Sequence, residues 1–343
     1  MFLCSNIQEM KKGSNISGRV AWLDVARAFG IYAIYLGHFG EVAGPAYRFV
    51  FQFHVPLFFF LSGCAETYNK EEAVFGNLKR NVKTILLPAY FFAVLSLMIY
   101  VINANADLTE ACIWGQLIIK GLVRNTYLAA SLWFLTCLFV VKTIFALLKR
   151  MKKWYWLMAV GIFMFLLAEY GMSPRPIDSP RYYYNLDSAC YYMHFYIAGF
   201  LLYPRMKEWL EKTGSIAKSA KTVIAVGLLG YAGLMYFQIN VLSYIPIHNM
   251  IADSGLRLLK TYLMIGAIIM LAYYLQEVEV LSKVGQDTLY LCGSEYMIKI
   301  VVPSIFGIVG LAINLDGPLY VCVYTMMLLW AGEKIFVPWE KIL

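Results

Sequence analysis

Apolar runs long enough to cross a membrane recur along the whole chain, separated by short polar stretches. A transmembrane helix needs about 20 predominantly apolar residues. We expect ten such spans, at 20–38, 49–66, 84–103, 130–148, 154–170, 186–203, 220–238, 256–275, 288–311 and 317–337. A shorter apolar stretch at 111–123 fits an interfacial or re-entrant segment. The pattern predicts an all-α polytopic membrane protein, with a cytoplasmic segment at 1–19 and one membrane domain at 20–338.

Composition and charge agree with this fold class. The chain is 61% hydrophobic and 15% charged, whereas soluble domains are roughly 45–50% apolar and about 25% charged. Lys and Arg fall mostly in the loops on the side of the N-terminus, which places both termini in the cytoplasm by the positive-inside rule. This distribution accounts for the net charge of +8 and indicates no nucleic-acid partner. The 7 cysteines occur singly, so neither a disulfide framework nor a metal site is expected.

The first span carries three polar side chains on one helical face. At 100° per residue, Arg27 and His38 lie within about 20° of each other and about 16 Å apart along the axis. Asp24 is about 60° from Arg27 on the same arithmetic. Charges that face lipid are costly, so this face should point into a bundle or a water-filled cavity. Two alternatives are open: Asp24 and Arg27 pair and reach the interface, and His38 is a packed bundle histidine.

The second span holds the run His-Val-Pro-Leu-Phe-Phe-Phe-Leu-Ser-Gly at 54–63. Pro56 removes a backbone donor and should kink this helix. His54 lies toward the outer end, at a depth similar to that of His38, so the two imidazoles could share a cavity. The alternative is that His54 bonds a backbone carbonyl freed by Pro56.

Further polar candidates lie at span ends and within the ninth span. Arg80 and Lys83 sit at the inner mouth of the third span, where they would bind lipid headgroups or the phosphates of a nucleotide-like donor. Trp133 opens the fourth span as an interface anchor or a substrate contact. Glu295 and Lys299 are spaced i,i+4 and can pair; the pair is either structural or part of a site. We expect His194 to be packed in the bundle, His248 to be exposed, and the loop 174–180 to be solvated or part of an acceptor mouth.

Together these motifs resemble the membrane acyltransferase-3 family. The resemblance rests on Leu-Asp-x-x-Arg at 23–27, Arg27 and His38 with ten residues between them, the run at 54–63, the basic residues before Pro88, and Leu-Trp-Phe-Leu at 132–135. It covers nearly the whole chain, and the branch it most resembles contains the fucose 4-O-acetylases and related polysaccharide O-acetyltransferases.

The resemblance implies an O-acyltransferase, an enzyme that transfers an acyl group, here acetyl and not an aminoacyl group, to a hydroxyl. Its donor would be acetyl-CoA or another acyl-CoA, used as a substrate with no bound cofactor. Its acceptor would be a hydroxyl of a cell-surface glycan or a lipid-linked saccharide. By position, Arg27 and His38 match the family's essential pair, Asp24 its preceding acidic residue, and Arg80 with Lys83 its Arg-x-x-Arg. In two places the chain departs from the family: Lys83 replaces Arg, and Glu295 stands where His is frequent.

In the expected mechanism His38 is the general base, since an imidazole titrates near neutral pH. Asp24, Arg27 and His54 would complete the catalytic group, Arg80 and Lys83 would hold the donor phosphates, and Trp133 and Glu295 would contact substrate. The expected location is a cell membrane, the bacterial cytoplasmic membrane. The rival hypotheses are a transporter or non-catalytic solute-binding membrane protein, and a structural subunit of a glycan-assembly complex. The sequence leaves open the acceptor sugar, the acyl chain and homo-oligomer formation.

Overall fold

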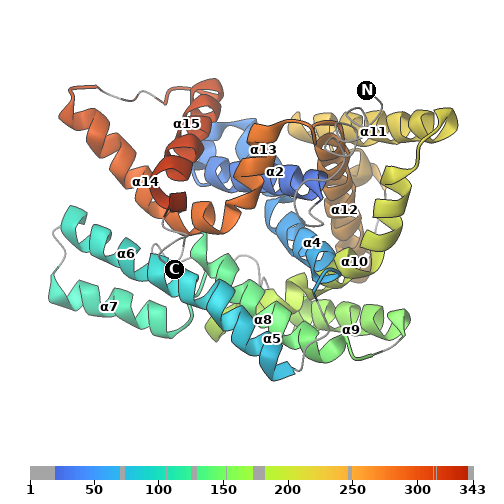
Figure 1. Ribbon diagram of the computed structural model, residues 1–343, viewed down its shortest axis with the longest axis horizontal. Helices are drawn as coiled ribbons and strands as arrows, with labels where there is room; N and C mark the ends of the chain where they lie inside the picture. The colour runs from blue at the N-terminus through green and yellow to red at the C-terminus, as the bar shows by residue number, and fades with distance from the viewer. Residues whose placement is uncertain are drawn as a thin grey trace, which may run out of the picture.

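The computed structural model describes residues 20–69, 74–104, 107–124, 130–151, 153–172, 182–245, 249–311, 313 and 315–338. Within these ranges the chain is helical and contains no strand (Figure 1), which confirms the all-α class. The expected N-terminal segment 1–19, the loop 174–180 and His248 lie outside the described residues.

The expected spans correspond to helices throughout. The helices are α2 (Ala21–Gly37), α3 (Pro45–Val50), α4 (His54–Glu66), α5 (Val74–Asn81), α6 (Leu87–Ala104), α7 (Leu108–Ile119), α8 (Leu132–Leu148), α9 (Trp154–Leu166), α10 (Leu186–Glu211), α11 (Ser215–Tyr236), α12 (Met250–Tyr274), α13 (Glu279–Gln286), α14 (Thr288–Ile308) and α15 (Pro318–Phe336). Short 3₁₀ or π segments are η1 (Gly40–Ala43), η2 (Val82–Leu86), η3 (Leu167–Met172), η4 (Tyr183–Asn185) and η5 (Val241–Tyr244).

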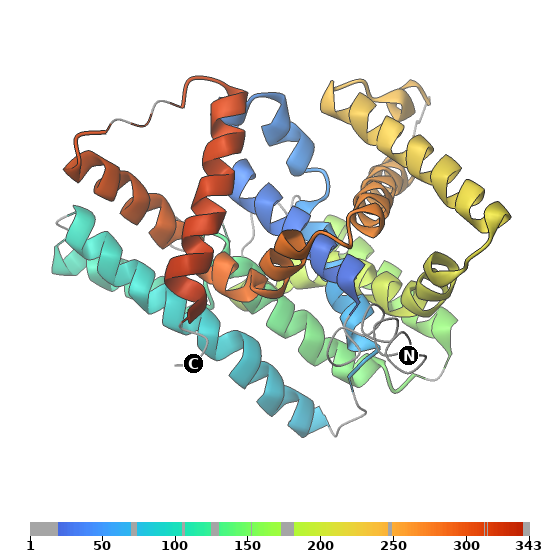
Figure 2. The ribbon, with the colours of Figure 1, turned by 45° about the horizontal axis from the view of Figure 1, so that its top comes forward.

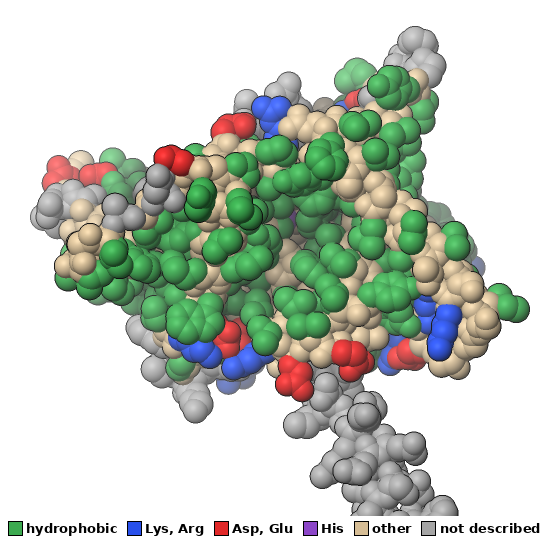
Figure 3. Space-filling model, turned by 90° about the horizontal axis from the view of Figure 1, so that it is seen from above, with side chains coloured by type: hydrophobic (Ala, Val, Ile, Leu, Met, Phe, Trp, Pro, Cys, Tyr) green, Lys and Arg blue, Asp and Glu red, His purple; other side chains and the backbone are tan. Residues whose placement is uncertain are grey.

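Within the described residues, 7 helical segments are long and apolar enough to cross a membrane, and α8 is a shorter apolar helix. The protein is therefore polytopic; the total of ten spans and the cytoplasmic termini stay predictions. The apolar stretch at 111–123 is mostly α7, which lies beside α6. Hydrophobic side chains cover the middle of the face in Figure 3, and charged side chains lie mainly near its margins, as expected of a surface in contact with lipid.

Pro56 does not kink the second span as expected. The span is instead divided into α3 and α4 by a turn at 51–53. Pro56 therefore occupies the first turn of α4, where a proline costs no intrahelical hydrogen bond. The break places His54 at the start of a helix rather than in the middle of one.

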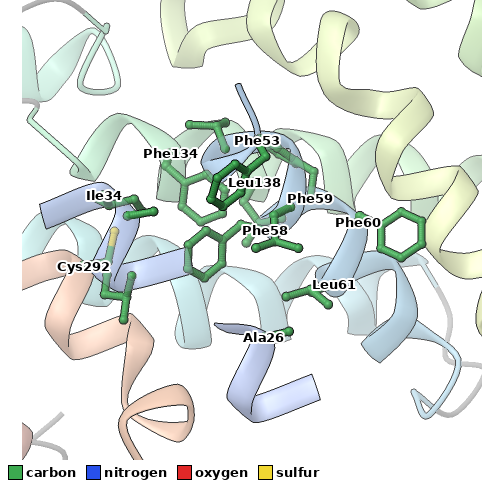
Figure 4. Close-up of a cluster of buried hydrophobic side chains, with 14 of the residues drawn as sticks. Ala26, Ile34, Phe53, Phe58, Phe59, Phe60, Leu61, Phe134, Leu138 and Cys292 are labelled. Atoms are coloured by element: carbon green, nitrogen blue, oxygen red, sulfur yellow. The ribbon is translucent and has the colours of Figure 1, made fainter. Parts of the chain in front are cut away.

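The centre of the bundle is the contact of α4 with α10. A Cβ added at Gly63 would lie 2.0 Å from the carbonyl oxygen of Tyr196, and one at Gly199 would lie 2.0 Å from that of Phe60. Glycine at both positions thus allows the two backbones to touch, a common way for membrane helices to pack. Phenylalanines of α4 and α8 fill the adjoining core (Figure 4), and the Phe58 and Phe134 rings lie 5.4 Å apart.

Helix α2 runs through the interior, packed against α4, α12, α13, α14 and α15 (Figure 2). Helix α13 packs against the first turn of α2. The two backbones are so close there that a Cβ added at Gly285 would lie 1.7 Å from the carbonyl oxygen of Asp24. This central position confirms that the polar face of α2 points into protein. It also places the two ends of that face, Arg27 and His38, in two different parts of the bundle.

Candidate functional site

His38 terminates α2 and meets an acid from the other end of the chain. The helix ends at Gly37, and the backbone N–H of His38 still bonds the Ile34 carbonyl. The His38 Nδ1 lies 2.7 Å from Oε1 of Glu295 on α14. The imidazole is 30% exposed, whereas the carboxylate is 1% exposed. An ionised carboxylate only accepts hydrogen bonds, so Nδ1 is the donor in this contact, which leaves Nε2 as the nitrogen that carries the lone pair whenever the ring is neutral.

Lys299 completes this cluster. Its Nζ lies 2.6 Å from Glu295 Oε1, which confirms the expected i,i+4 pair. The same ammonium donates to the Tyr35 carbonyl at 3.0 Å and lies 4.5 Å from the centre of the Phe39 ring. The Tyr35 hydroxyl donates to the carbonyl of Leu291, which lies one turn before Glu295 on α14, at 2.7 Å. These contacts attach the last turn of α2 to α14 and hold the imidazole against the carboxylate.

His54 is buried beside this cluster. Its Nδ1 donates to the Val50 carbonyl at 2.7 Å, and its ring lies edge-on to Phe51 at 4.8 Å. The Val50 carbonyl also accepts the backbone N–H of Phe53 at 3.2 Å, so it belongs to the turn between α3 and α4 and is not a carbonyl freed by Pro56. His54 interacts electrostatically with His38, so the two imidazoles do lie in one region.

A second polar cluster surrounds Glu66 at the end of α4. Glu66 is 6% exposed, and its Oε1 lies 3.1 Å from Lys149 Nζ. Its Oε2 lies 3.4 Å from Lys142 Nζ and accepts hydrogen bonds from Asn69 Nδ2 at 2.6 Å and Tyr196 OH at 3.1 Å. Lys142 lies on α8, and Lys149, seven positions later, is the residue that directly follows the end of this helix. We refer to Glu66, Lys142 and Lys149 as the inner cluster, because the orientation that the positive-inside rule predicts would put them at the cytoplasmic side.

Two arginines contribute positive potential at Lys142 of the inner cluster. Arg27 pairs with Asp24 at 2.8 Å, as in one of the alternatives that the sequence left open, and Asp24 is buried. The Arg27 charge also acts on Lys142. Arg80 donates to Asn77 Oδ1 at 2.7 Å and also interacts with Lys142. Lys83 is exposed on η2, and the structure shows no hydrogen bond or ion pair for it among the described residues.

Trp133 lies in another part of the structure. It is buried at the start of α8, where the Arg124 guanidinium lies 5.2 Å from the ring centre and Tyr192 lies 6.3 Å away. Two residues earlier, Ser131 Oγ donates to the Cys292 carbonyl at 2.6 Å, one turn before Glu295. The structure therefore links the Trp133 segment to the helix of Glu295 through Ser131.

Sequence reasoning missed the His38–Glu295 contact and the whole inner cluster. The seven-residue spacing of Lys142 and Lys149, along and at the end of an apolar helix, was a usable signal for the inner cluster. A charge within a membrane span needs a partner. Among the described residues, no group of three or more His, Cys, Asp or Glu side chains could hold a metal ion.

The chain was compared with protein-family models, curated proteins and solved structures. No curated protein and no solved structure matches the chain. The family model for acyltransferase-3, described as an acyltransferase domain, matches residues 20–332. The chain therefore belongs to the acyltransferase-3 family and is a multi-pass membrane acyltransferase.

Proposed function

We propose that this protein is an O-acetyltransferase of the cell membrane. It would transfer acetyl from acetyl-CoA to a hydroxyl of a cell-surface glycan or its lipid-linked precursor. The observation that carries the proposal is the His38–Glu295 pair, which has the geometry of a general base held by a carboxylate.

His38 meets the structural requirements of a base. Its Nδ1 is engaged by Glu295, and its Nε2 makes no hydrogen bond among the described residues. Its side chain is partly exposed, so an acceptor can approach. A positioned base of this kind contributes about 10²–10⁴-fold in rate. Glu295 contacts His38 directly and so has the position to orient it; its contact with substrate stays a prediction.

The proposed step balances without any further reactant. Nε2 of His38 takes the proton of the acceptor hydroxyl as its oxygen attacks the thioester carbonyl carbon. The C–O bond forms, the C–S bond breaks, and the leaving thiolate takes the proton from His38. The products are the acetyl ester and coenzyme A.

Helix α2 would connect the two substrates. Arg27 at its inner end lies beside the inner cluster, and His38 caps its other end. About 16 Å of helix separates the two residues. A donor with anionic phosphates at one end and its acyl group on a long flexible arm fits this separation, with the phosphates near Arg80 and the thioester at His38.

Transfer of radiolabelled acetyl from acetyl-CoA to membrane glycan tests the proposal. We expect label with the wild type and a loss of at least about 10²-fold in His38→Ala at matched expression. The matched control is His194→Phe, which removes a buried imidazole packed against Phe195 on α10. Equal labelling in His38→Ala would remove His38 from the chemistry. Absence of label with the wild type would favour the transporter hypothesis.

A further inference from the structure

The inner cluster contains more positive than negative charge within the membrane domain. Lys142 and Lys149 are 17% and 14% exposed, and among the described residues the only carboxylate that either of them contacts is Glu66. Arg27 and Arg80 add positive potential at Lys142. Partly buried charges in a membrane protein are costly unless they are paired. The site is therefore suited to an additional anion.

Each oxygen of Glu66 has a different set of partners. Oε1 contacts the Lys149 ammonium. Oε2 accepts from two uncharged donors, Asn69 and Tyr196, besides its longer contact with Lys142. The uncharged donors can continue to solvate the carboxylate if the ammonium groups move away. Each lysine has a flexible four-carbon stem and a point charge, so it can change partner without a backbone movement.

We propose that Glu66 is an internal counter-ion, and that the phosphates of the acyl donor take Lys142 and Lys149 from it on binding. This inference rests on the proposed function and identifies which cations receive the donor. Lys142 lies two turns before Lys149, the residue at the C-terminal end of α8, which is about 10 Å along the helix axis. Together with Arg80, whose charge acts on Lys142, they supply three cations that the phosphates of one donor molecule would bridge.

Replacing the carboxylate should strengthen donor binding, because the donor no longer competes with it. Coenzyme A binding to the full-length protein in lipid nanodiscs, measured by calorimetry, tests this directly. We expect Glu66→Gln to lower the Kd for coenzyme A about tenfold and Lys149→Met to raise it about tenfold, in line with single charge-assisted hydrogen bonds. Tyr196→Phe removes one of the uncharged donors that solvate the Glu66 carboxylate after the lysines leave it, so this variant should raise the Kd by a smaller factor.

The pair Lys212–Glu208 provides matched controls. It is also expected on the inner side, its atoms lie 3.2 Å apart, and both side chains are exposed. We expect Glu208→Gln and Lys212→Met to leave the Kd unchanged. The same change in Glu208→Gln as in Glu66→Gln would reduce the effect to general surface charge and overturn the proposal.

The two proposals fail in different ways. A folded Glu66→Gln protein with unchanged or weaker coenzyme A binding shows that Glu66 only neutralises the lysines, and it overturns the exchange. Inorganic pyrophosphate serves as a second probe. If its Kd falls in Glu66→Gln and rises in Lys149→Met while that of coenzyme A does not, the exchange stands and the assignment of the donor is wrong. Absence of binding of both probes to wild type and Glu66→Gln overturns the exchange. Loss of acetyl transfer in these variants is not needed for any of these conclusions.

Discussion

The imidazole of His38 and the carboxylate of Glu295 lie 2.7 Å apart, although 257 positions separate them in the chain. The contact joins the end of the first membrane helix to the middle of α14. It fixes which ring nitrogen of His38 carries the proton, and that gives Glu295 a positioning role in the proposed reaction.

Replacing Glu295 by Gln should lower kcat by about 10- to 10²-fold, a part of what a general base contributes. The amide can still contact Nδ1 but no longer stabilises the imidazolium that forms in the reaction. The KM for acetyl-CoA should change little, because the contact lies away from the inner cluster. Steady-state kinetics of the purified protein would show this division between kcat and KM.

Glu333 is a matched control for this variant. It is a largely buried glutamate whose Oε1 lies 2.9 Å from Lys283 Nζ. We expect Glu333→Gln to retain kcat. Equal losses in Glu295→Gln and Glu333→Gln would mean that the effect comes from the loss of a structural ion pair.

His54 should tolerate replacement better than His38. Its Nδ1 is bound to the Val50 carbonyl, a contact that the side-chain amide of Asn can also make. We expect His54→Asn to lose less than about tenfold in acetyl transfer, against at least about 10²-fold for His38→Ala. A loss in His54→Asn as large as that in His38→Ala would support the sequence-based hypothesis that His54 is catalytic.

Gly199→Ala should destabilise the bundle. The added methyl group would lie 2.0 Å from the Phe60 carbonyl oxygen, so α4 and α10 would have to move apart. Overpacking of this kind costs about 1–3 kcal/mol. Thermal unfolding in detergent should show a lower midpoint. Gly227→Ala on α11, where a Cβ would meet no atom within 4 Å, should leave the midpoint unchanged or raise it slightly.

The predicted topology can be tested with single cysteines. The positive-inside rule places Ser215 at the cytoplasmic end of α11 and Tyr244 on the outer side. Both positions are exposed. In whole cells, a membrane-impermeant maleimide should label Tyr244→Cys and not Ser215→Cys. After lysis the reagent reaches both sides of the membrane and should label both variants. Labelling of Ser215→Cys in intact cells would reverse the assigned orientation.

Features within one helix could be predicted from the sequence. The inward polar face of α2, the Asp24–Arg27 pair and the Glu295–Lys299 pair depend on helical periodicity alone, and the structure shows all three. Arg80, expected at the inner mouth, does lie beside the inner cluster.

Features that depend on neighbouring helices could not be predicted. The His38–Glu295 contact requires α2 and α14 to be adjacent, and the inner cluster requires α4 to end beside α8. No local pattern encodes such neighbours, because lipid-facing and protein-facing apolar residues look alike in the sequence. For the same reason the burial of Trp133 against Arg124 was not visible.

The central claim is that His38 performs chemistry rather than binding. The most direct test is the rate of coenzyme A release from acetyl-CoA by purified protein with an added saccharide acceptor, measured for wild type and His38→Ala together with the Kd for coenzyme A. We predict that His38→Ala loses at least about 10²-fold in rate while the Kd stays within about twofold. An unchanged rate, or a rate loss explained fully by a weaker Kd, would contradict the assignment of His38 as the general base.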